Sequence, residues 1–220
     1  MEQADLFPAA PGRIGTDESG KGDYFGPLVI AGFFLPDDQE GVLRELGVRD
    51  SKRLSDNRCR EIAETLKQGY VFSVVTIGPE KYNELYEKFR NLNKLLAWGH
   101  ARVIENILDR VPAAKAITDQ FGSERFVLNA LLERGKGIEL IQRTNAEEDP
   151  AVAAASILAR AEFLKRLHFL GVECGVELPK GAGPQVEVAA AKLVRARGVE
   201  ALDKVAKKHF KITERVLKAL

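Results

Sequence analysis

The chain has few cysteines, no long apolar run and almost no net charge. Its 220 residues include two cysteines, Cys59 and Cys174, and no CxxC pair, which argues against a structural zinc site or a disulfide framework. It contains no run of eighteen apolar residues, and its N-terminus lacks the basic start and apolar core of a signal peptide. Unpaired thiols are typical of a reducing compartment, so the sequence predicts a cytoplasmic protein without a membrane span.

Positive and negative side chains balance, with 33 Lys and Arg against 32 Asp and Glu. The net charge of +1 gives no sign of nucleic-acid binding by itself, although acids at a metal site would offset basic residues elsewhere. The C-terminal part is basic, which suits either phosphate contacts or a solvated helix surface. With 45% apolar and 30% charged residues, the chain is an ordinary globular protein. We expect a flexible lead over residues 1–12 and one domain over residues 13–220.

The hydrophobic pattern predicts an α/β protein, because strands come first and then alternate with helices. Residues 13–18 and 27–35 are expected to form an antiparallel hairpin, and residues 138–142 a strand at a possible sheet edge. Ser55 is a good cap for a helix that follows it. The other predicted strands are 70–77 and 114–119, and the predicted helices are 58–67, 93–110, 126–135, 151–169, 185–197 and 199–220.

The most informative segment is Thr16–Pro27, in which Asp17 and Glu18 directly precede Gly20-Lys21-Gly22. Adjacent carboxylates at a strand end suit Mg²⁺ or Mn²⁺, which prefer hard oxygen ligands. Glycines beside a lysine let a backbone approach a phosphate and supply a cation. The spacing matches neither a Walker A motif nor a dinucleotide fingerprint. The segment therefore favours metal-assisted phosphodiester chemistry.

A second acid, Asp119, also ends an apolar strand. If the two strands are adjacent in the sheet, Asp17 and Asp119 meet, and a metal ion relieves the cost of burying their charges. The alternative is that Asp119 is a simple turn residue. Glu18 points away from Asp17 in a regular strand, so it needs a strand end or a local distortion to join the same site.

Several segments, in this order, resemble the type 2 ribonucleases H, and ribonuclease HIII in particular. The opening motif Asp17-Glu18-Ser19-Gly20-Lys21-Gly22 is the most specific, since ribonuclease HII usually has Gly-Arg-Gly there. The similarity covers about residues 13–215 and includes the segments Asp50-Ser51-Lys52, Tyr82–Tyr86 through Asn91–His100, Thr118-Asp119-Gln120-Phe121, Ala153–Arg160, Leu178–Ala182 and His209-Phe210-Lys211. The resemblance implies a ribonuclease H-like fold, with a mixed central sheet flanked by helices and a helical C-terminal region.

The resemblance also implies a function. Enzymes of this family are endonucleases that hydrolyse the RNA strand of RNA–DNA hybrids with two Mg²⁺ or Mn²⁺ ions, leaving 5′-phosphate and 3′-hydroxyl ends. It assigns Asp17, Glu18 and Asp119 as metal ligands, with a fourth acid just before the alanine-rich helix. Alignment of Ala-Glu selects Glu147 for that place, Asp149 is the competing choice, and Glu148 is less favoured.

The substrate contacts implied by the resemblance lie outside the acids. Gly20, Lys21 and Gly22 would line the minor groove of the hybrid, where backbone groups reach the 2′-hydroxyl. Ser51 and Lys52 would contact the scissile or a neighbouring phosphate, and Lys180 is a weaker phosphate candidate.

The 16 residues before Asp17 are too few for the N-terminal substrate-binding domain of typical ribonuclease HIII, which indicates a truncated or short form.

Three other functions stay open at this point. Cleavage at single ribonucleotides in DNA, as in ribonuclease HII, is one alternative, and a catalytically silent hybrid-binding module is another. The third is an unrelated hydrolase of small phosphate esters. The protein is expected to be a monomer.

Overall fold

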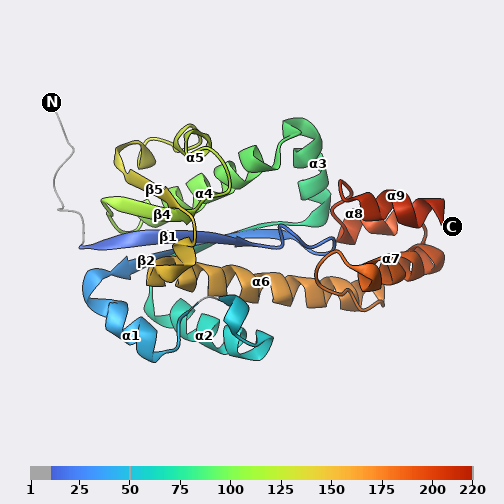
Figure 1. Cartoon of the computed structure of the whole chain (residues 1–220), viewed down its shortest axis with the longest axis horizontal. Helices are drawn as coiled ribbons and strands as arrows, with labels where there is room; N and C mark the ends of the chain where they lie inside the picture. Colours follow the sequence, from blue (N-terminus) through green and yellow to red (C-terminus); the bar gives the residue numbers. More distant parts are fainter. Residues whose placement is uncertain (1–10, 50, 220) are drawn as a thin grey trace. The chain divides into compact units, whose positions relative to one another are not determined.

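The structure is a computed structural model that describes residues 11–49 and 51–219 (Figure 1). The chain divides into two compact units. The first contains the described residues up to Glu18, together with Ile30–Val75 and Leu96–Ala161, and the second contains Ser19–Val29, Thr76–Leu95 and Glu162–Leu220. The prediction of one domain over residues 13–220 stays a prediction, and most of the predicted lead, residues 1–12, lies outside the described residues.

The first unit is built on a five-stranded sheet with the order β3-β2-β1-β4-β5. β1 pairs with β4 in parallel, and β4 pairs with β5 in parallel. The predicted strands are all present, and the last of them lies at an edge of the sheet. Their bounds are β1 (Gly12–Ser19), β2 (Leu28–Pro36), β3 (Phe72–Ile77), β4 (Lys115–Asp119) and β5 (Glu139–Arg143).

Helices cover both faces of this sheet, which confirms the predicted mixed sheet flanked by helices. Within the first unit, α4 (Leu92–Leu108) lies on one face and α6 (Pro150–Cys174) on the other (Figure 1). Side chains alternate between the two faces along each strand. On the α4 face, Ile14 and Ala116 join a buried cluster with Ile104 of α4. On the α6 face, Ile117 packs with Val152.

Shorter helices complete the first unit. Ser55 caps α2 as predicted, because its side chain accepts a hydrogen bond from the Arg58 N–H at 3.2 Å. The thiol of Cys59 donates to the Ile157 carbonyl, which ties α2 to α6. The bounds are η1 (Asp37–Gln39), α1 (Glu40–Glu45), η2 (Ser51–Arg53), α2 (Asp56–Gly69), α5 (Arg125–Leu128), η3 (Gly135–Gly137) and η4 (Ala146–Glu148).

The predicted helix over residues 126–135 is wrong. Only α5 and η3 are helical there, and a turn joins them. The reason is the buried carboxylate of Glu105 on α4, whose Oε1 accepts the Leu132 N–H at 2.6 Å and the Gly135 N–H at 2.9 Å. Backbone donors that a regular helix would use internally are instead satisfied by this side chain.

The second unit is mainly helical, as predicted for the C-terminal region. It contains α3 (Pro79–Phe89), α7 (Pro184–Arg197), α8 (Ala201–Val205) and α9 (Lys211–Lys218). The single helix predicted over residues 199–220 is wrong, because residues 206–210 leave the helical path. The Asn83 side chain explains the break, since it donates to the Ala206 carbonyl and accepts from the Lys208 N–H, both at 2.9 Å.

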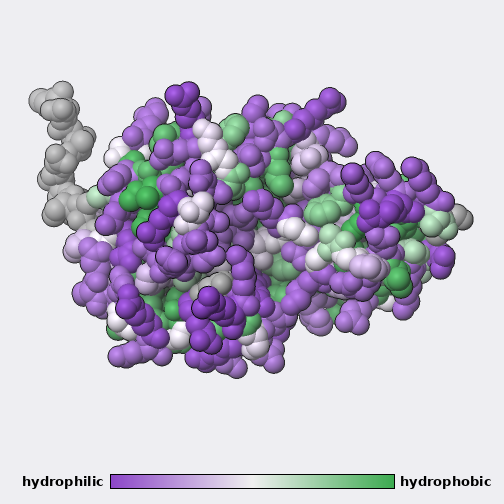
Figure 2. Space-filling model, in the orientation of Figure 1, coloured by the Kyte–Doolittle hydropathy of each residue, from purple (hydrophilic) through white to green (hydrophobic). Residues whose placement is uncertain are grey.

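Most of the visible surface of each unit is hydrophilic (Figure 2). Among the described residues, no helix is long and apolar enough to cross a membrane.

Candidate functional site

Asp17 and Asp119 lie side by side at the ends of two central strands. β1 and β4 run parallel, with Thr16 paired to Thr118, so the residues that follow occupy equivalent places. Because side chains alternate, the two carboxylates share the face on which α6 packs. The Asp119 Oδ1 accepts the Ala146 N–H at 3.3 Å, which places the η4 turn beside it. The prediction that these two acids end adjacent strands is therefore correct.

The carboxyl group of Asp17 is held in a poorly solvated place. Burial, followed by the nearby charges of Glu18 and Asp119, raises its pKa to about 7, while a hydrogen bond from Ser156 opposes the rise. The Glu18 N–H also donates to Asp17 Oδ1 at 2.8 Å. Carboxylates that repel each other in a poorly solvated site are the donors that a hard divalent cation would stabilise.

A polar network connects the Asp17 side to Glu147. The hydroxyl groups of Ser156 on α6 and Ser51 on η2 are 2.8 Å apart and buried. The next residue, Lys52, is highly exposed, and its Nζ lies 3.4 Å from Glu147 Oε1. Arg160 also donates to the Ser51 carbonyl, which fixes η2 against α6. The predicted Ser51-Lys52 pair therefore lies between two of the predicted acids, and Asp50 lies outside the described residues.

Asp149 has a different environment from Glu147. The Nε of Arg13 donates to both carboxylate oxygens of Asp149, at 3.1 and 2.9 Å, and the two side chains are only 11% and 10% exposed. Asp149 Oδ1 also accepts the Ala151 N–H at 2.9 Å in the first turn of α6. An arginine and a helix N-terminus already compensate this charge, whereas the Glu147 carboxylate is paired with an exposed lysine. The charge of Asp149 is therefore compensated by more buried partners than the charge of Glu147.

Glu18 lies on the other face of β1 from Asp17. Its Oε2 is 3.2 Å from Nε2 of His100, a fully buried residue of α4. The strand continues to Ser19 without interruption, so the local distortion considered for Glu18 is not present. Glu18 can reach a metal shared with Asp17 only around the end of the strand.

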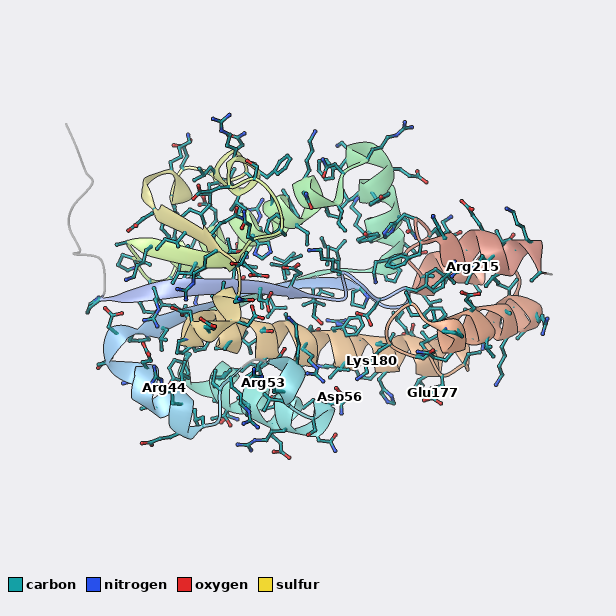
Figure 3. The ribbon with its side chains drawn as sticks, in the orientation of Figure 1. Arg44, Arg53, Asp56, Glu177, Lys180 and Arg215 are labelled. Atoms are coloured by element: carbon teal, nitrogen blue, oxygen red, sulfur yellow. The ribbon has the colours of Figure 1, made fainter. Side chains whose placement is uncertain are left out.

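A polar cavity of about 560 Å³ opens next to Glu147. Arg44 on α1 and Arg53 on η2 both border it, and Figure 3 shows their side chains on the same side of the sheet. Its other lining residues are Val48, Arg49, Asn145, Glu147, Glu148, Pro150 and Ala153. Three guanidinium groups around a cavity form a favourable place for phosphate oxygens.

The Gly20-Lys21-Gly22 loop belongs to the second unit, where the C-terminal region shapes the loop. Gly20 has φ +88°, and a Cβ there would lie 2.2 Å from the Pro27 carbonyl oxygen, so the fold itself requires glycine. Gly22 is exposed, has no such conformation, and a Cβ there would meet nothing within 4 Å. Just beyond Lys180, which is exposed, the Gly181 N–H donates to Asp23 Oδ1 at 2.6 Å.

Within the described residues, no group of three or more His, Cys, Asp and Glu side chains is arranged so that it could hold a metal ion as it stands. The carboxylates instead lie along the ends of β1 and β4 and on η4. Oxygen donors alone, at the ends of central strands, fit Mg²⁺ or Mn²⁺ better than a softer metal.

Sequence reasoning missed His100, Ser156 and Arg13 as partners of the acids. One signal was present, because the dipeptide Thr-Asp occurs at residues 16–17 and again at residues 118–119, each at the end of an apolar strand. Two polar residues at the same register of neighbouring strands require a polar partner from the helix that covers them. The identity of that partner depends on helix packing, which the sequence does not encode locally.

Comparison with known proteins defines the class to which this fold and site belong. The family model of ribonuclease HII matches residues 14–213, so the chain belongs to this family of type 2 ribonucleases H. Its relatives point to one branch. Ribonuclease HIII of Protochlamydia amoebophila is 46% identical over 213 residues, covering 97% of this chain and 69% of that relative. Ribonuclease HIII of Chlamydia pneumoniae is 46% identical over 220 residues, covering 97% of this chain and 72% of that relative.

Solved structures agree. The crystal structure of Bst-RNase HIII in complex with Mn²⁺ matches with a TM-score of 0.88 and 33% sequence identity, over 99% of this chain and 75% of that chain. The resemblance to type 2 ribonucleases H, and to ribonuclease HIII in particular, is confirmed.

Proposed function

We propose that the chain hydrolyses the RNA strand of RNA–DNA hybrids at the ends of β1 and β4, where Asp17, Glu18, Asp119 and Glu147 hold two Mg²⁺ or Mn²⁺ ions. The family and the relatives make the chain a ribonuclease H, a metal-dependent enzyme of the ribonuclease HII family. The parallel register that sets Asp17 beside Asp119 is the observation that carries the assignment of the site.

The metal ions would supply an activated water and a stabilised leaving 3′-oxygen, so that cleavage leaves 5′-phosphate and 3′-hydroxyl ends. The side chains of the protein would hold the metal ions and contact the substrate. The carboxylates of Asp17 and Asp119 would bind the metal ions from the face of the sheet that α6 covers. The Glu18 carboxylate would reach the same ions from the face that α4 covers. Lys52, which is 80% exposed, has the reach to move from Glu147 to a phosphate of the substrate.

One feature supports nucleic-acid phosphates as the groups recognised beside the acids. The cavity that contains Glu147 is bordered by Arg44, Arg49 and Arg53, which can bind phosphate oxygens of one strand. Ser51 is buried and bonded to Ser156, so we propose that it holds Lys52 in place and does not itself contact a phosphate.

Gly22 is the residue of the loop that supports recognition of RNA. The fold explains glycine at position 20, but nothing in the second unit requires it at position 22. A glycine that the fold does not need leaves room for a ligand, and a bare backbone can approach the ribose 2′-hydroxyl. We assign Lys21 and Lys180 to phosphates along the same strand.

The test uses end-labelled RNA–DNA hybrid beside duplex DNA that contains one ribonucleotide. We expect Mg²⁺- or Mn²⁺-dependent cleavage of the hybrid at several positions and weak cleavage at the single ribonucleotide. Asp119→Asn should abolish turnover with the fold intact, because a neutral amide cannot hold the metal charge. Binding of hybrid without cleavage by the wild type in either metal would instead establish the silent binding module.

We also propose that the protein acts in the cytoplasm as a monomer. Both cysteines are free, which suits a reducing compartment. Light scattering at micromolar concentration should give the mass of one chain, and a mass of two chains would refute the monomer.

A further inference from the structure

His100 forms a buried polar connection between α4 and two strands of the sheet. The residue is fully buried, as are Thr16 and Thr118. Its Nδ1 lies 2.8 Å from the Thr16 hydroxyl and 3.4 Å from the Thr118 hydroxyl. Its Nε2 lies 3.2 Å from Glu18 Oε2, and its ring stacks on Phe121 at 4.9 Å. Both ring nitrogens and one ring face are therefore engaged.

Close packing of α4 brings this ring to the sheet. The preceding residue is Gly99, and a Cβ at that position would lie 2.6 Å from Ile30 Cδ1 on β2. Glycine thus allows the helix to approach β2 closely, and the neighbouring His100 side chain reaches the two threonines. The stacked Phe121 restricts rotation of the ring. The imidazole is held in one orientation before any metal or substrate arrives.

The hydrogen-bond partners define the tautomer. A carboxylate only accepts hydrogen bonds, so Nε2 must carry the proton that it donates to Glu18. Thr118 has a second acceptor in the Asp119 carbonyl at 3.3 Å, whereas the Thr16 hydroxyl is nearer to the ring and can donate to Nδ1. With the proton on Nε2 and the Thr16 hydroxyl donating to Nδ1, the ring satisfies all of these contacts.

We propose that His100 is a positioning residue for Glu18. Glu18 faces α4 while Asp17 faces α6, so Glu18 reaches the shared metal position only if its side chain is turned along the end of β1. A hydrogen bond from Nε2 fixes one carboxylate oxygen in that direction, and Thr16 keeps the imidazole in the donating tautomer. Groups that orient a ligating carboxylate in this way typically change metal affinity or activity by about 10- to 100-fold when they are removed. The proposal rests on the assignment of Glu18 as a metal ligand.

Two matched pairs of variants test this role. His100→Gln keeps an N–H donor near the position of Nε2, whereas His100→Asn keeps polar atoms only near Nδ1. Thr16→Val removes the hydroxyl 2.8 Å from Nδ1, and Thr118→Val removes the one 3.4 Å away. We measure Mn²⁺ affinity by calorimetry without substrate, and then kcat and KM on RNA–DNA hybrid. Circular dichroism and the Tm confirm that each variant is folded.

We expect His100→Asn to weaken Mn²⁺ binding and lower kcat by about tenfold or more with KM nearly unchanged, and His100→Gln to recover most of both. The losses of Mn²⁺ affinity and kcat in Thr16→Val should be closer to those in His100→Asn than the losses in Thr118→Val are. Equal losses for the asparagine and glutamine variants, or no loss in either, would overturn the positioning role. If the wild type cleaves no hybrid, the proposed function fails, while the order of Mn²⁺ affinities still decides the role of His100.

Discussion

Replacing Asp17 with asparagine should stabilise the metal-free protein while it destroys the metal site. Burial and the charges of Glu18 and Asp119 raise the pKa of Asp17 from 3.8 to about 7. A pKa change of this size corresponds to at most roughly 4 kcal/mol of folding free energy at pH 8, where Asp17 is charged in both states. The asparagine side chain is neutral and keeps an oxygen for the Glu18 N–H. We expect a net gain of about 1–3 kcal/mol for Asp17→Asn at pH 8 in EDTA.

The stability of the metal-free protein should depend on pH in a direction that the raised pKa of Asp17 determines. Because the folded pKa is raised, folded Asp17 holds a proton that the unfolded chain has already released between pH 4 and 7. The stability of the metal-free wild type should therefore fall as pH rises through this window, and the advantage of Asp17→Asn should disappear near pH 4. Mg²⁺ should raise the Tm of the wild type at pH 8 and leave that of the variant unchanged, because binding to the folded state alone is stabilising.

Urea denaturation gives the free energy of unfolding of the wild type and of Asp17→Asn. We measure it at pH 4.5 and at pH 8, each with EDTA and with Mg²⁺. Asp149→Asn is the matched control, because it should lower the free energy of unfolding where Asp17→Asn raises it. It removes the carboxylate that accepts from Arg13 Nε, although Glu40 still pairs with the guanidinium, so it should lose about 1–3 kcal/mol. If Asp17→Asn is no more stable than the wild type at pH 8 in EDTA, or if its advantage is the same at pH 4.5, the reasoning about the site is refuted.

Three further predictions concern the fourth acid, the loop and a buried lysine. Glu147→Gln should lower Mn²⁺ affinity or kcat by roughly tenfold or more, and a larger kinetic loss in a folded Asp149→Asn would reverse the assignment. Gly22→Val should leave the Tm nearly unchanged and block hybrid cleavage, whereas Gly20→Ala should lower the Tm; normal cleavage by the valine variant would reduce the loop to a structural turn. Burial lowers the pKa of Lys207 to about 7, so the wild type should gain stability as pH rises from 7 toward 10, where only the unfolded chain stays protonated. Lys207→Met should show a smaller gain in urea unfolding over that range, and an unchanged slope would contradict the assignment.

Local patterns predict the strands and most helices of this chain well. Apolar runs with turn residues at their ends mark all five strands to within about two residues, and Ser55 marks the start of α2. The two wrong helices share one cause. Side chains distant in sequence, Glu105 and Asn83, take over backbone hydrogen bonds and redirect the chain. Such contacts depend on the folded arrangement, which propensity and periodicity do not contain.

The acids of the proposed site could be named from the sequence, whereas the partners that they contact in the structure could not. Asp17 and Asp119 follow from a simple rule, since an acid at the end of a buried strand needs a counter-charge. The choice between Glu147 and Asp149 stayed open in the sequence, because both precede α6. In the structure their environments differ by the Arg13–Asp149 pair, which joins residues 136 positions apart, and Glu147 as the fourth acid stays a prediction.

The composition of β1 itself points to function. β1 is the central strand of the sheet, yet among its eight residues only Ile14 is a large apolar residue. Its neighbour β2 is almost entirely apolar and buried, so the core of the sheet depends on β2 and the covering helices. The polar side chains of Thr16, Asp17 and Glu18 in β1 are tolerated because each finds a partner: Thr16 and Glu18 contact His100, and Asp17 contacts Ser156. A central strand that breaks the apolar pattern needs such compensation on both faces. Polar residues in this strand lower its stability, and we interpret them as serving the proposed metal site, so the loss of one partner should affect metal binding more than folding.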